Sequence, residues 1–369
     1  MPKNVLITGG CGFIGRYVTD ELLAAGHRVR ILDSLVQQVH GAGAAGRRKD
    51  AETIAGDVRD RELVRSCLKG IDHVVHLAAE VGVGQSMYEI DRYVGANDLG
   101  TAVLLQELIE RPVESLVVAS SMSVYGEGLY ETADGQRRER VRRRRKDIEA
   151  RRWDPRDDAG NRLRPVSTDE EKPVDLASIY ALTKYTQERA VLIFAEAYGI
   201  RATALRLFNV FGAGQALSNP YTGVLANFAS RLANEQPPTV FEDGEQRRDF
   251  VHVRDVARAF AAALDQPLAA GQVINIGSGV SYSIRDVAQL LAQAMGVPRI
   301  EPEILGKARS GDIRNCFADI SKARELMGFQ PRHRLEDSLG EFAEWVRGTP
   351  AVDNGAEMRR QLEERGLVS

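Results

Sequence analysis

The chain has 369 residues, 43% of them hydrophobic and 27% charged, which suits one large α/β domain carrying a smaller lobe. Its formal net charge of −3 gives no reason to expect nucleic acid or an acidic membrane as a partner, and no apolar run approaches the roughly 20 residues that span a bilayer. Three scattered cysteines without CxxC spacing argue against a disulfide framework or a zinc site and favour a cytoplasmic protein: Cys11, Cys67 and Cys316.

The first 120 residues alternate strand and helix signals. Short apolar runs predict buried strands at residues 5–8, 28–33, 54–57, 72–77 and 116–120. Apolar residues at helical spacing predict helices at 15–25, closed by Gly26, and at 98–110. Repeated βα units of this length predict an α/β fold with a Rossmann doubly wound parallel sheet.

Residues 127–166 have a different composition, with 12 arginines and few apolar side chains. We expect a basic insertion that forms a solvated, mobile surface. A lid over the site is an alternative, because both ends of the segment adjoin the motifs described below, and a surface that binds nucleic acid or a partner is another. A helix at 178–198 and a strand at 202–207 then resume the α/β pattern.

The first strand leads directly into three glycines spaced three apart, Gly9, Gly12 and Gly15. Glycine allows the positive φ of a tight turn and lets backbone N–H groups approach a pyrophosphate, to which a helix N-terminus adds partial positive charge. Asp33 ends the second predicted strand, where a carboxylate accepts from a ribose hydroxyl and repels the extra phosphate of NADP. NAD is therefore the expected cofactor. Asp57 is expected to reach the adenine, with a helix cap as the alternative.

Tyr180 and Lys184 are spaced as YxxxK, which places both on one face of a helix. An ammonium group beside a phenol favours the phenolate and is expected to lower the pKa of Tyr180, which makes it a general base. Ser121 lies in a run of hydroxyl residues at the end of the fifth predicted strand, the edge where open α/β sheets bind ligands. The alternatives are a surface tyrosine beside a solvated lysine, and serines that only satisfy backbone groups.

The order of these motifs, with His76-Leu77-Ala78-Ala79 and the run from Ser120 to Gly126 between them, resembles the extended short-chain dehydrogenase/reductase family. Within that family the chain is similar to nucleotide-sugar epimerases of the UDP-glucose 4-epimerase type. Further matching segments are residues 206–212, 248–252 and 275–279, so the resemblance extends to about residue 345.

The resemblance implies a catalytic trio of Ser121, Tyr180 and Lys184. It implies a cofactor site formed by Gly9, Gly12, Phe13, Ile14, Gly15, Asp33, Asp57, Val58, Leu77, Ala78, Ala79, Asn97, Tyr180 and Lys184. It implies a substrate site formed by Ser121, Ser123, Tyr180, Asn209, Phe241, Arg248, Arg309 and Asp312. In that site Arg248 and Arg309 would hold the diphosphate, Phe241 the base and Asp312 the ribose. Some relatives carry paired cysteines in a similar insertion, which suggests zinc. Residues 127–166 of this chain contain no cysteine, so no metal is expected.

The expected domains are residues 1–210, an NAD-binding Rossmann domain containing the insertion; 211–348, mainly a nucleotide-sugar-binding lobe; and 349–369, an amphipathic helical tail with Met358, Leu362 and Leu367. The tail would pack on the lobe or on a second subunit. The resemblance also implies a homodimer formed through the helix at 178–198.

The expected activity is epimerisation of a UDP- or dTDP-hexose at carbon 4 through a 4-keto intermediate, including a 6-deoxy sugar such as dTDP-rhamnose. In the dehydratases of this family the corresponding residues resemble Thr-Asp-Glu, whereas this chain has Ser121-Met122-Ser123. Neither Met122 nor Ser123 supplies the acid that elimination of water needs. The alternatives are a net oxidoreductase or dehydratase of the same family and a non-catalytic NAD-sensing regulator. The sensor would need no catalytic trio.

Overall fold

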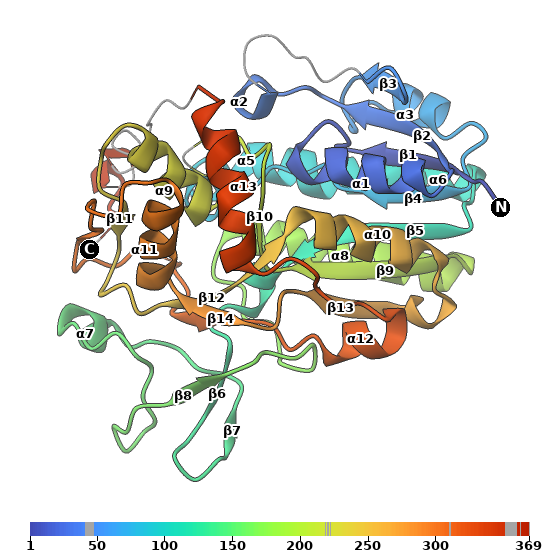
Figure 1. The fold of residues 1–369 in the computed structure, drawn as a ribbon. Coiled ribbons are helices and arrows are strands. Elements are labelled where there is room, and N and C mark those ends of the chain that lie inside the picture. Colours follow the sequence, from blue (N-terminus) through green and yellow to red (C-terminus); the bar gives the residue numbers. More distant parts are fainter. Residues whose placement is uncertain are drawn as a thin grey trace.

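A seven-stranded parallel sheet organises the larger lobe of the protein, seen in a computed structural model (Figure 1). The structure describes all residues except 41–47, 218, 220, 222, 310, 351–359, 362 and 369. The strand order is β13-β9-β5-β4-β1-β2-β3. The strands are β1 (Asn4–Thr8), β2 (Arg28–Asp33), β3 (Glu52–Ala55), β4 (His73–His76), β5 (Ser115–Ser121), β9 (Arg201–Leu207) and β13 (Gln272–Ile276). The predicted fold class is confirmed.

Helices cover both faces of this sheet, so the central strands are buried as continuous apolar runs. On one face lie α1 (Phe13–Ala24), α10 (Val253–Asp265) and α12 (Ser321–Met327). On the other lie α3 (Arg61–Cys67), α6 (Gly100–Glu110) and α8 (Ile179–Tyr198). Shorter helical segments are α2 (Gln37–His40), α4 (Val83–Ser86), α5 (Ile90–Tyr93), the π-helical η1 (Val94–Leu99), and the 3-10 turns η2 (Met122–Tyr125) and η3 (Pro267–Ala269).

Local signals set most of these boundaries. β2 spans the predicted residues, and α8 begins where the Ser178 hydroxyl accepts from the N–H of Ala181. It ends at Gly199, whose φ of 68° is the left-handed conformation that closes a helix. The predicted third strand was wrong by two residues: β3 pairs only with β2 and stops at Ala55, opposite Asp33.

The smaller lobe surrounds a four-stranded sheet of β10 (Asn209–Phe211), β12 (Arg247–His252), β14 (Ser281–Ser283) and β16 (Asn315–Cys316). A two-stranded sheet pairs β11 (Thr239–Val240) with β15 (Glu303–Ile304). Three helices share its core: α9 (Val224–Ala233), α11 (Ile284–Ala294) and α13 (Leu335–Arg347).

The predicted boundary at residue 210 does not divide the two lobes along the chain. α10 and β13 follow that boundary in the sequence, yet α10 packs on α1 and β13 pairs with β9 in the large sheet. The smaller lobe therefore consists of three stretches, because the chain returns to the Rossmann sheet first with α10 and β13 and then with α12.

The insertion folds into an antiparallel sheet of β7 (Arg137–Arg138), β6 (Leu129–Glu131) and β8 (Arg164–Val166), with the short helix α7 (Arg145–Glu149). Tyr130, Val141 and Leu163 form its small core. We call residues 127–166 the arm, because it projects from the body beneath β12 and β14 in Figure 1. Most of its arginines are exposed, as expected, but Arg143 is only 6% exposed.

Candidate active site

The glycine turn between β1 and α1 is shaped for a close backbone approach. Gly9 has a φ of +74°, and a Cβ there would lie 2.8 Å from the Ala78 nitrogen. A Cβ on Gly15 would lie 2.4 Å from the Gly9 carbonyl oxygen. At Gly12, by contrast, a Cβ would meet only the Gly9 oxygen, at 3.3 Å, so the space beyond the start of α1 is open. These three glycines fit the pyrophosphate of a dinucleotide.

Asp33 is 6% exposed and faces this turn. Its carboxylate accepts from the backbone N–H groups of Cys11 (2.9 Å) and Leu35 (2.8 Å), and His40 Nε2 lies 3.4 Å away. Burial opposes ionisation, but the hydrogen bonds from His40 and from the two backbone groups hold the pKa of Asp33 below its usual value. A fixed anion here fits a ribose hydroxyl and disfavours a phosphate. The sequence analysis did not identify His40.

The other predicted cofactor residues differ in what they contact. Asp57 pairs with Arg59 (2.6 Å) and caps no helix, because Asp60 is the cap of α3. Val58 is buried in the core beside α6. Asn97 is buried, and its amide bonds the Glu80 backbone (2.7 and 3.2 Å) and the Thr183 hydroxyl (2.9 Å).

Because these bonds use both the oxygen and the nitrogen of the Asn97 side-chain amide, Asn97 positions the segment that follows β4. Leu77 N–H donates to the Thr8 carbonyl, and Ala78 lies against Gly9. Ala79 follows in the same segment, next to Glu80. The segment 77–80 thus forms one wall of the glycine turn.

Tyr180 and Ser121 come together from different elements, α8 and the last residue of β5. The Ser121 side chain interacts with the Tyr180 phenol, and Ser123 Oγ donates to Ser121 Oγ (2.9 Å). The Tyr180 ring packs edge-on against Tyr93, with 6.5 Å between ring centroids. Burial raises the pKa of Tyr180, and the bond to Ser121 opposes that rise.

Lys184 does not lower the pKa of the phenol in this structure, contrary to the sequence-based expectation. Its Nζ donates to Gln187 Oε1 (2.6 Å) within a buried network. Gln187 Nε2 lies 2.8 Å from Thr101 Oγ1 and 3.2 Å from His76 Nε2, and His76 Nδ1 lies 2.7 Å from Thr8 Oγ1. Burial lowers the pKa of Lys184 to about 7 and that of His76 to about 3. Desolvation thus dominates, and Lys184 is directed toward this network.

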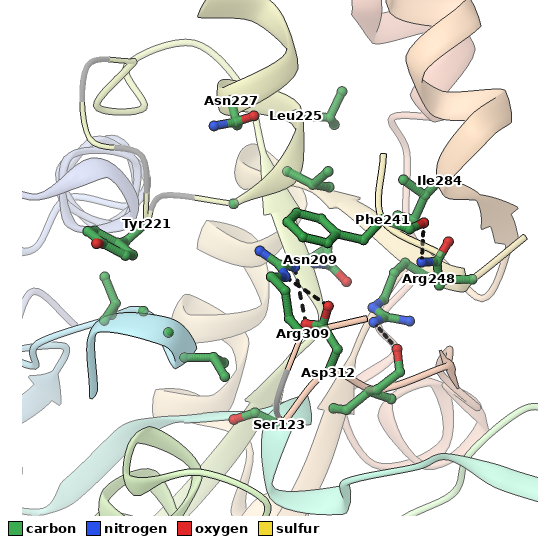
Figure 2. Close-up of a pocket in the computed structure, with 18 of the residues that line it drawn as sticks. Ser123, Asn209, Tyr221, Leu225, Asn227, Phe241, Arg248, Ile284, Arg309 and Asp312 are labelled. Atoms are coloured by element: carbon green, nitrogen blue, oxygen red, sulfur yellow. Dashed lines mark hydrogen bonds and ion pairs between the residues drawn. The ribbon is translucent and has the colours of Figure 1, made fainter. Parts of the chain in front are cut away.

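A cavity of about 670 Å³, lined in part by Tyr180, opens between the two lobes. Figure 2 shows part of its wall. Its wall includes ten of the predicted site residues: Phe13, Ile14, Ser121, Ser123, Tyr180, Asn209, Phe241, Arg248, Arg309 and Asp312. Every predicted substrate residue therefore faces one space. None of residues 127–166, all of which the structure describes, lines this cavity, so the arm does not cover it in this structure.

The cations of the cavity are already held by the protein. Arg309 donates to both carboxylate oxygens of Asp312 (2.8 and 3.1 Å), and its guanidinium lies 4.4 Å from the Phe241 ring centroid (Figure 2). Arg248 donates to backbone carbonyls, including that of Ile313. A planar guanidinium in this arrangement suits a diphosphate, which would compete with Asp312 for Arg309.

Asn209 presents a buried amide oxygen without a hydrogen-bond partner among the described residues, and so do Gln215 and Gln246. All three residues line the cavity. A buried acceptor left unsatisfied is costly, and a ligand hydroxyl or N–H would relieve that cost. The carboxamides of Gln215 and Gln246 carried no signal in the sequence because they belong to no motif.

The C-terminal tail also reaches this cavity, with Arg360, Glu363 and Leu367 in its wall. Gln361 Oε1 accepts from the hydroxyls of Tyr221 (3.1 Å) and Tyr88 (3.2 Å). Val368 forms an isolated antiparallel bridge with Arg309. The tail thus contributes to the cavity wall; the sequence analysis expected it on the lobe or on a second subunit and did not predict this contact with the cavity. Met358 and Leu362 lie outside the described residues.

The described part of the chain contains neither a cluster of metal-binding side chains nor a membrane-spanning helix. No group of three or more His, Cys, Asp or Glu side chains there could hold a metal ion. None of the described helices is long and apolar enough to cross a membrane.

Comparisons with known proteins agree with this geometry. The sequence model of the NAD dependent epimerase/dehydratase family matches residues 5–146 and 157–277, leaving a gap within the arm. A dTDP-L-rhamnose 4-epimerase of Burkholderia thailandensis is 36% identical, over 93% of this chain and 95% of the relative. A putative UDP-glucose 4-epimerase of Methanocaldococcus jannaschii is 30% identical, over 93% of this chain and 98% of the relative.

Solved structures give the same result. UDP-glucose 4-epimerase of Thermotoga maritima with UDP-glucose superposes with a TM-score of 0.76 at 29% identity, over 94% of this chain and 99% of that one. UDP-glucose 4-epimerase of Thermus thermophilus in complex with NAD gives 0.75 at 28% identity, over 94% and 100% of the two chains.

Proposed function

The chain belongs to the NAD dependent epimerase/dehydratase family, and we propose that its cavity binds a UDP- or dTDP-hexose and inverts it at carbon 4. The family, the epimerase class and NAD as cofactor, all predicted from the sequence, are confirmed by the relatives. The residue roles and the identity of the substrate are the proposal.

One observation carries the assignment of roles: Ser121 and Tyr180 line the same cavity as Arg248 and Arg309. A sugar diphosphate held by the two arginines would extend its ring toward the hydroxyl pair. Oxidation of a sugar hydroxyl requires both a cationic group that holds the diphosphate and a pair of side chains that can transfer the hydroxyl proton.

NAD, when bound, supplies the acceptor and donor of the hydride that leaves and returns to the sugar carbon. The glycines 9, 12 and 15 would hold its pyrophosphate and Asp33 its ribose. Tyr180 would first give its own proton to the neutral amine of Lys184, one turn further along α8, and would then take the proton of the sugar hydroxyl, with Ser121 hydrogen-bonded to the same sugar oxygen. Lys184, with a pKa lowered to about 7, can hold or release a proton behind Tyr180.

Inversion also requires that the keto sugar rotate between the two hydride transfers, so that it presents its opposite face to the second. The diphosphate would stay fixed at Arg248 and Arg309 while the sugar rotates in the cavity. Met122 and Ser123, in η2 beside Ser121, offer no carboxylic acid, which supports epimerisation over loss of water.

The test is a screen of UDP- and dTDP-hexoses with purified protein and no added NADH, with products identified by NMR. Interconversion of two epimers without net change in absorbance at 340 nm supports the proposal. NADH accumulating in proportion to product would support the oxidoreductase alternative. No turnover of any sugar, despite tight NAD binding, would favour the regulator.

We also propose that the enzyme acts as a homodimer in the cytoplasm. Leu182, Ile193 and Tyr198 are 43%, 57% and 51% exposed on α8, and Leu99 is 53% exposed at the end of η1. Such an apolar surface on neighbouring helices suits a self-complementary contact. Cys67 and Cys316 are buried free thiols, which fits a reducing compartment. Light scattering that gives a monomer mass would contradict the dimer.

A further inference from the structure

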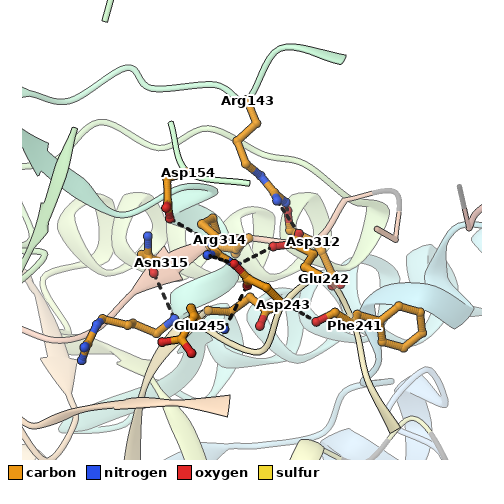
Figure 3. A network of polar contacts seen from close by, with 12 residues as sticks. Arg143, Asp154, Phe241, Glu242, Asp243, Glu245, Asp312, Arg314 and Asn315 are labelled. Atoms are coloured by element: carbon orange, nitrogen blue, oxygen red, sulfur yellow. Dashed lines mark hydrogen bonds and ion pairs between the residues drawn. The ribbon is translucent and has the colours of Figure 1, made fainter. Parts of the chain in front are cut away.

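Charged side chains of the arm contact the segments that form the wall of the substrate cavity, and Arg143 contacts two of these segments. The side chain of Arg143 extends from the arm into the smaller lobe and is 6% exposed. It pairs with Glu242 and donates to the backbone carbonyl of Asp312 (2.6 Å) (Figure 3), and it also pairs with Glu127 (3.1 Å). Arg143 thus joins two segments of the cavity wall, one containing Phe241 and the other containing Arg309 and Asp312.

Glu242 is the point at which this contact acts on the wall. It follows Phe241 directly, its side chain is fully buried, and its φ of 53° is in the left-handed region that side chains other than glycine rarely adopt. Its carboxylate is shared by Arg143 and by Arg314 (2.9 Å), whose side chain is also fully buried. Two arginines from distant segments therefore hold a strained backbone beside the Phe241 ring.

The charges of this cluster leave no spare cation. Its seven ionic side chains are three arginines and four carboxylates: Arg143, Arg162, Arg314, Glu127, Asp154, Glu242 and Asp243. Arg314 already binds Asp243 (2.6 Å) and Asp154 (2.9 Å), so it cannot replace Arg143. Loss of Arg143 leaves a buried carboxylate at Glu242 with half of its compensation.

We propose that Arg143 is a positioning residue for nucleotide-sugar binding: it makes the arm a brace that fixes the Phe241–Glu242 turn and the Arg309–Asp312 segment in their binding geometry. This inference rests on the proposed function of the cavity. The reacting groups lie elsewhere, on β5 and α8, and the glycine turn lies between β1 and α1. Arg143 should therefore govern affinity for the nucleotide diphosphate and leave NAD binding and turnover unchanged.

The experiment compares Arg143→Met with Arg145→Met in the NAD-loaded full chain. Arg145 lies two positions away, is 93% exposed and pairs only with Glu149 (2.8 Å) among the described residues, so it is the matched control. The measurements are Kd for UDP and dTDP by calorimetry, bound NAD per chain, and KM and kcat with the sugar that the wild type converts. We expect Arg143→Met to raise Kd and KM about tenfold, with kcat and NAD content unchanged, and Arg145→Met to match the wild type.

A second variant covers the case in which Arg143→Met does not fold. Arg143→Lys keeps the charge, but one ammonium cannot reproduce the planar fork that reaches Glu242, Glu127 and the Asp312 carbonyl together. It should fold and still bind the nucleotide several-fold more weakly. If a folded Arg143 variant binds UDP or dTDP with wild-type affinity, or loses kcat and bound NAD in parallel, the positioning role of Arg143 is refuted while the proposed function stands. A wild-type protein that binds neither UDP nor dTDP would overturn the proposed function with it.

Discussion

Gly12 and Gly15 differ by three positions, yet the structure predicts opposite consequences of replacing them by alanine. Gly12 has φ −67° and ψ 174°, which any residue adopts, and its Cβ would meet only one oxygen at 3.3 Å. Gly12→Ala should therefore fold normally. A Cβ on Gly15 would lie 2.4 Å from the Gly9 oxygen and 2.6 Å from the Gly10 Cα, so the turn itself would have to open.

The magnitudes follow from these contacts. A methyl on Gly12 occupies the space through which a pyrophosphate approaches the start of α1, and one lost charge-assisted hydrogen bond, about 1.5–3 kcal/mol, weakens NAD binding by roughly 10- to 150-fold. Overpacking at Gly15 costs about 1–3 kcal/mol of folding free energy, and each kcal/mol lowers Tm by about 2–4 °C in a domain of 150–250 residues.

Thermal unfolding of the cofactor-free protein and calorimetric titration with NAD separate the two effects. Gly12→Ala should keep its Tm and lose NAD affinity, whereas Gly15→Ala should lose both. An unchanged Kd for NAD in Gly12→Ala would refute the placement of the pyrophosphate at this helix. An unchanged Tm in Gly15→Ala would refute the packing argument.

Three further predictions concern the site around this turn. Tyr180→Phe keeps the edge-on ring contact with Tyr93 but removes the hydroxyl, so kcat should fall by about 10²–10⁴ with NAD still bound, and near-normal turnover would remove Tyr180 from the mechanism. His76 is neutral in the folded protein down to about pH 3, whereas an unfolded histidine is protonated below about pH 6.5. The free energy of unfolding that neutral His76 contributes is therefore lost as the pH falls from 6.5 towards 3, by up to about 1.4 kcal/mol for each pH unit. Urea unfolding at several pH values should show a shallower loss for His76→Asn, and equal slopes would contradict the assignment. Truncation after Thr349 removes Arg360, Glu363 and Leu367 from the cavity wall and should raise KM for the nucleotide sugar several-fold without changing NAD content; an unchanged KM would show that the tail does not contribute to binding.

Sequence alone was sufficient for the parts of the site that local chemistry determines. Gly9 to Gly15 lie between a short apolar run and a periodic helix, so their place in a βα turn required no knowledge of the rest of the fold. Asp33 ends β2 as expected, because the apolar run ends there. Ser121 and Tyr180 were brought together by the family resemblance, since nothing between β5 and α8 in the sequence indicates that they meet.

Properties that depend on surroundings were not predictable in the same way. The pKa of Tyr180 was expected to fall because Lys184 is four residues away on one helix, but burial of the phenol outweighs that neighbour. Lys184 itself is directed to Gln187, whose partners come from β4 and α6. Helical spacing gives the face on which a side chain lies and not the polarity of what covers it.

The arm shows this limit most sharply within one run of arginines. Arg143 and Arg145 are equivalent by composition, and a solvated surface is the correct prediction for Arg145 at 93% exposure. Arg143 is buried because its carboxylate partner Glu242 lies 99 residues further along the chain, on a turn whose backbone conformation the sequence does not reveal. A buried arginine persists only where several acceptors converge on it, so its position indicates where two distant segments must be held together. Here those segments are the arm and the wall that carries Phe241, and that is why one member of the run should affect substrate affinity while its neighbour should not.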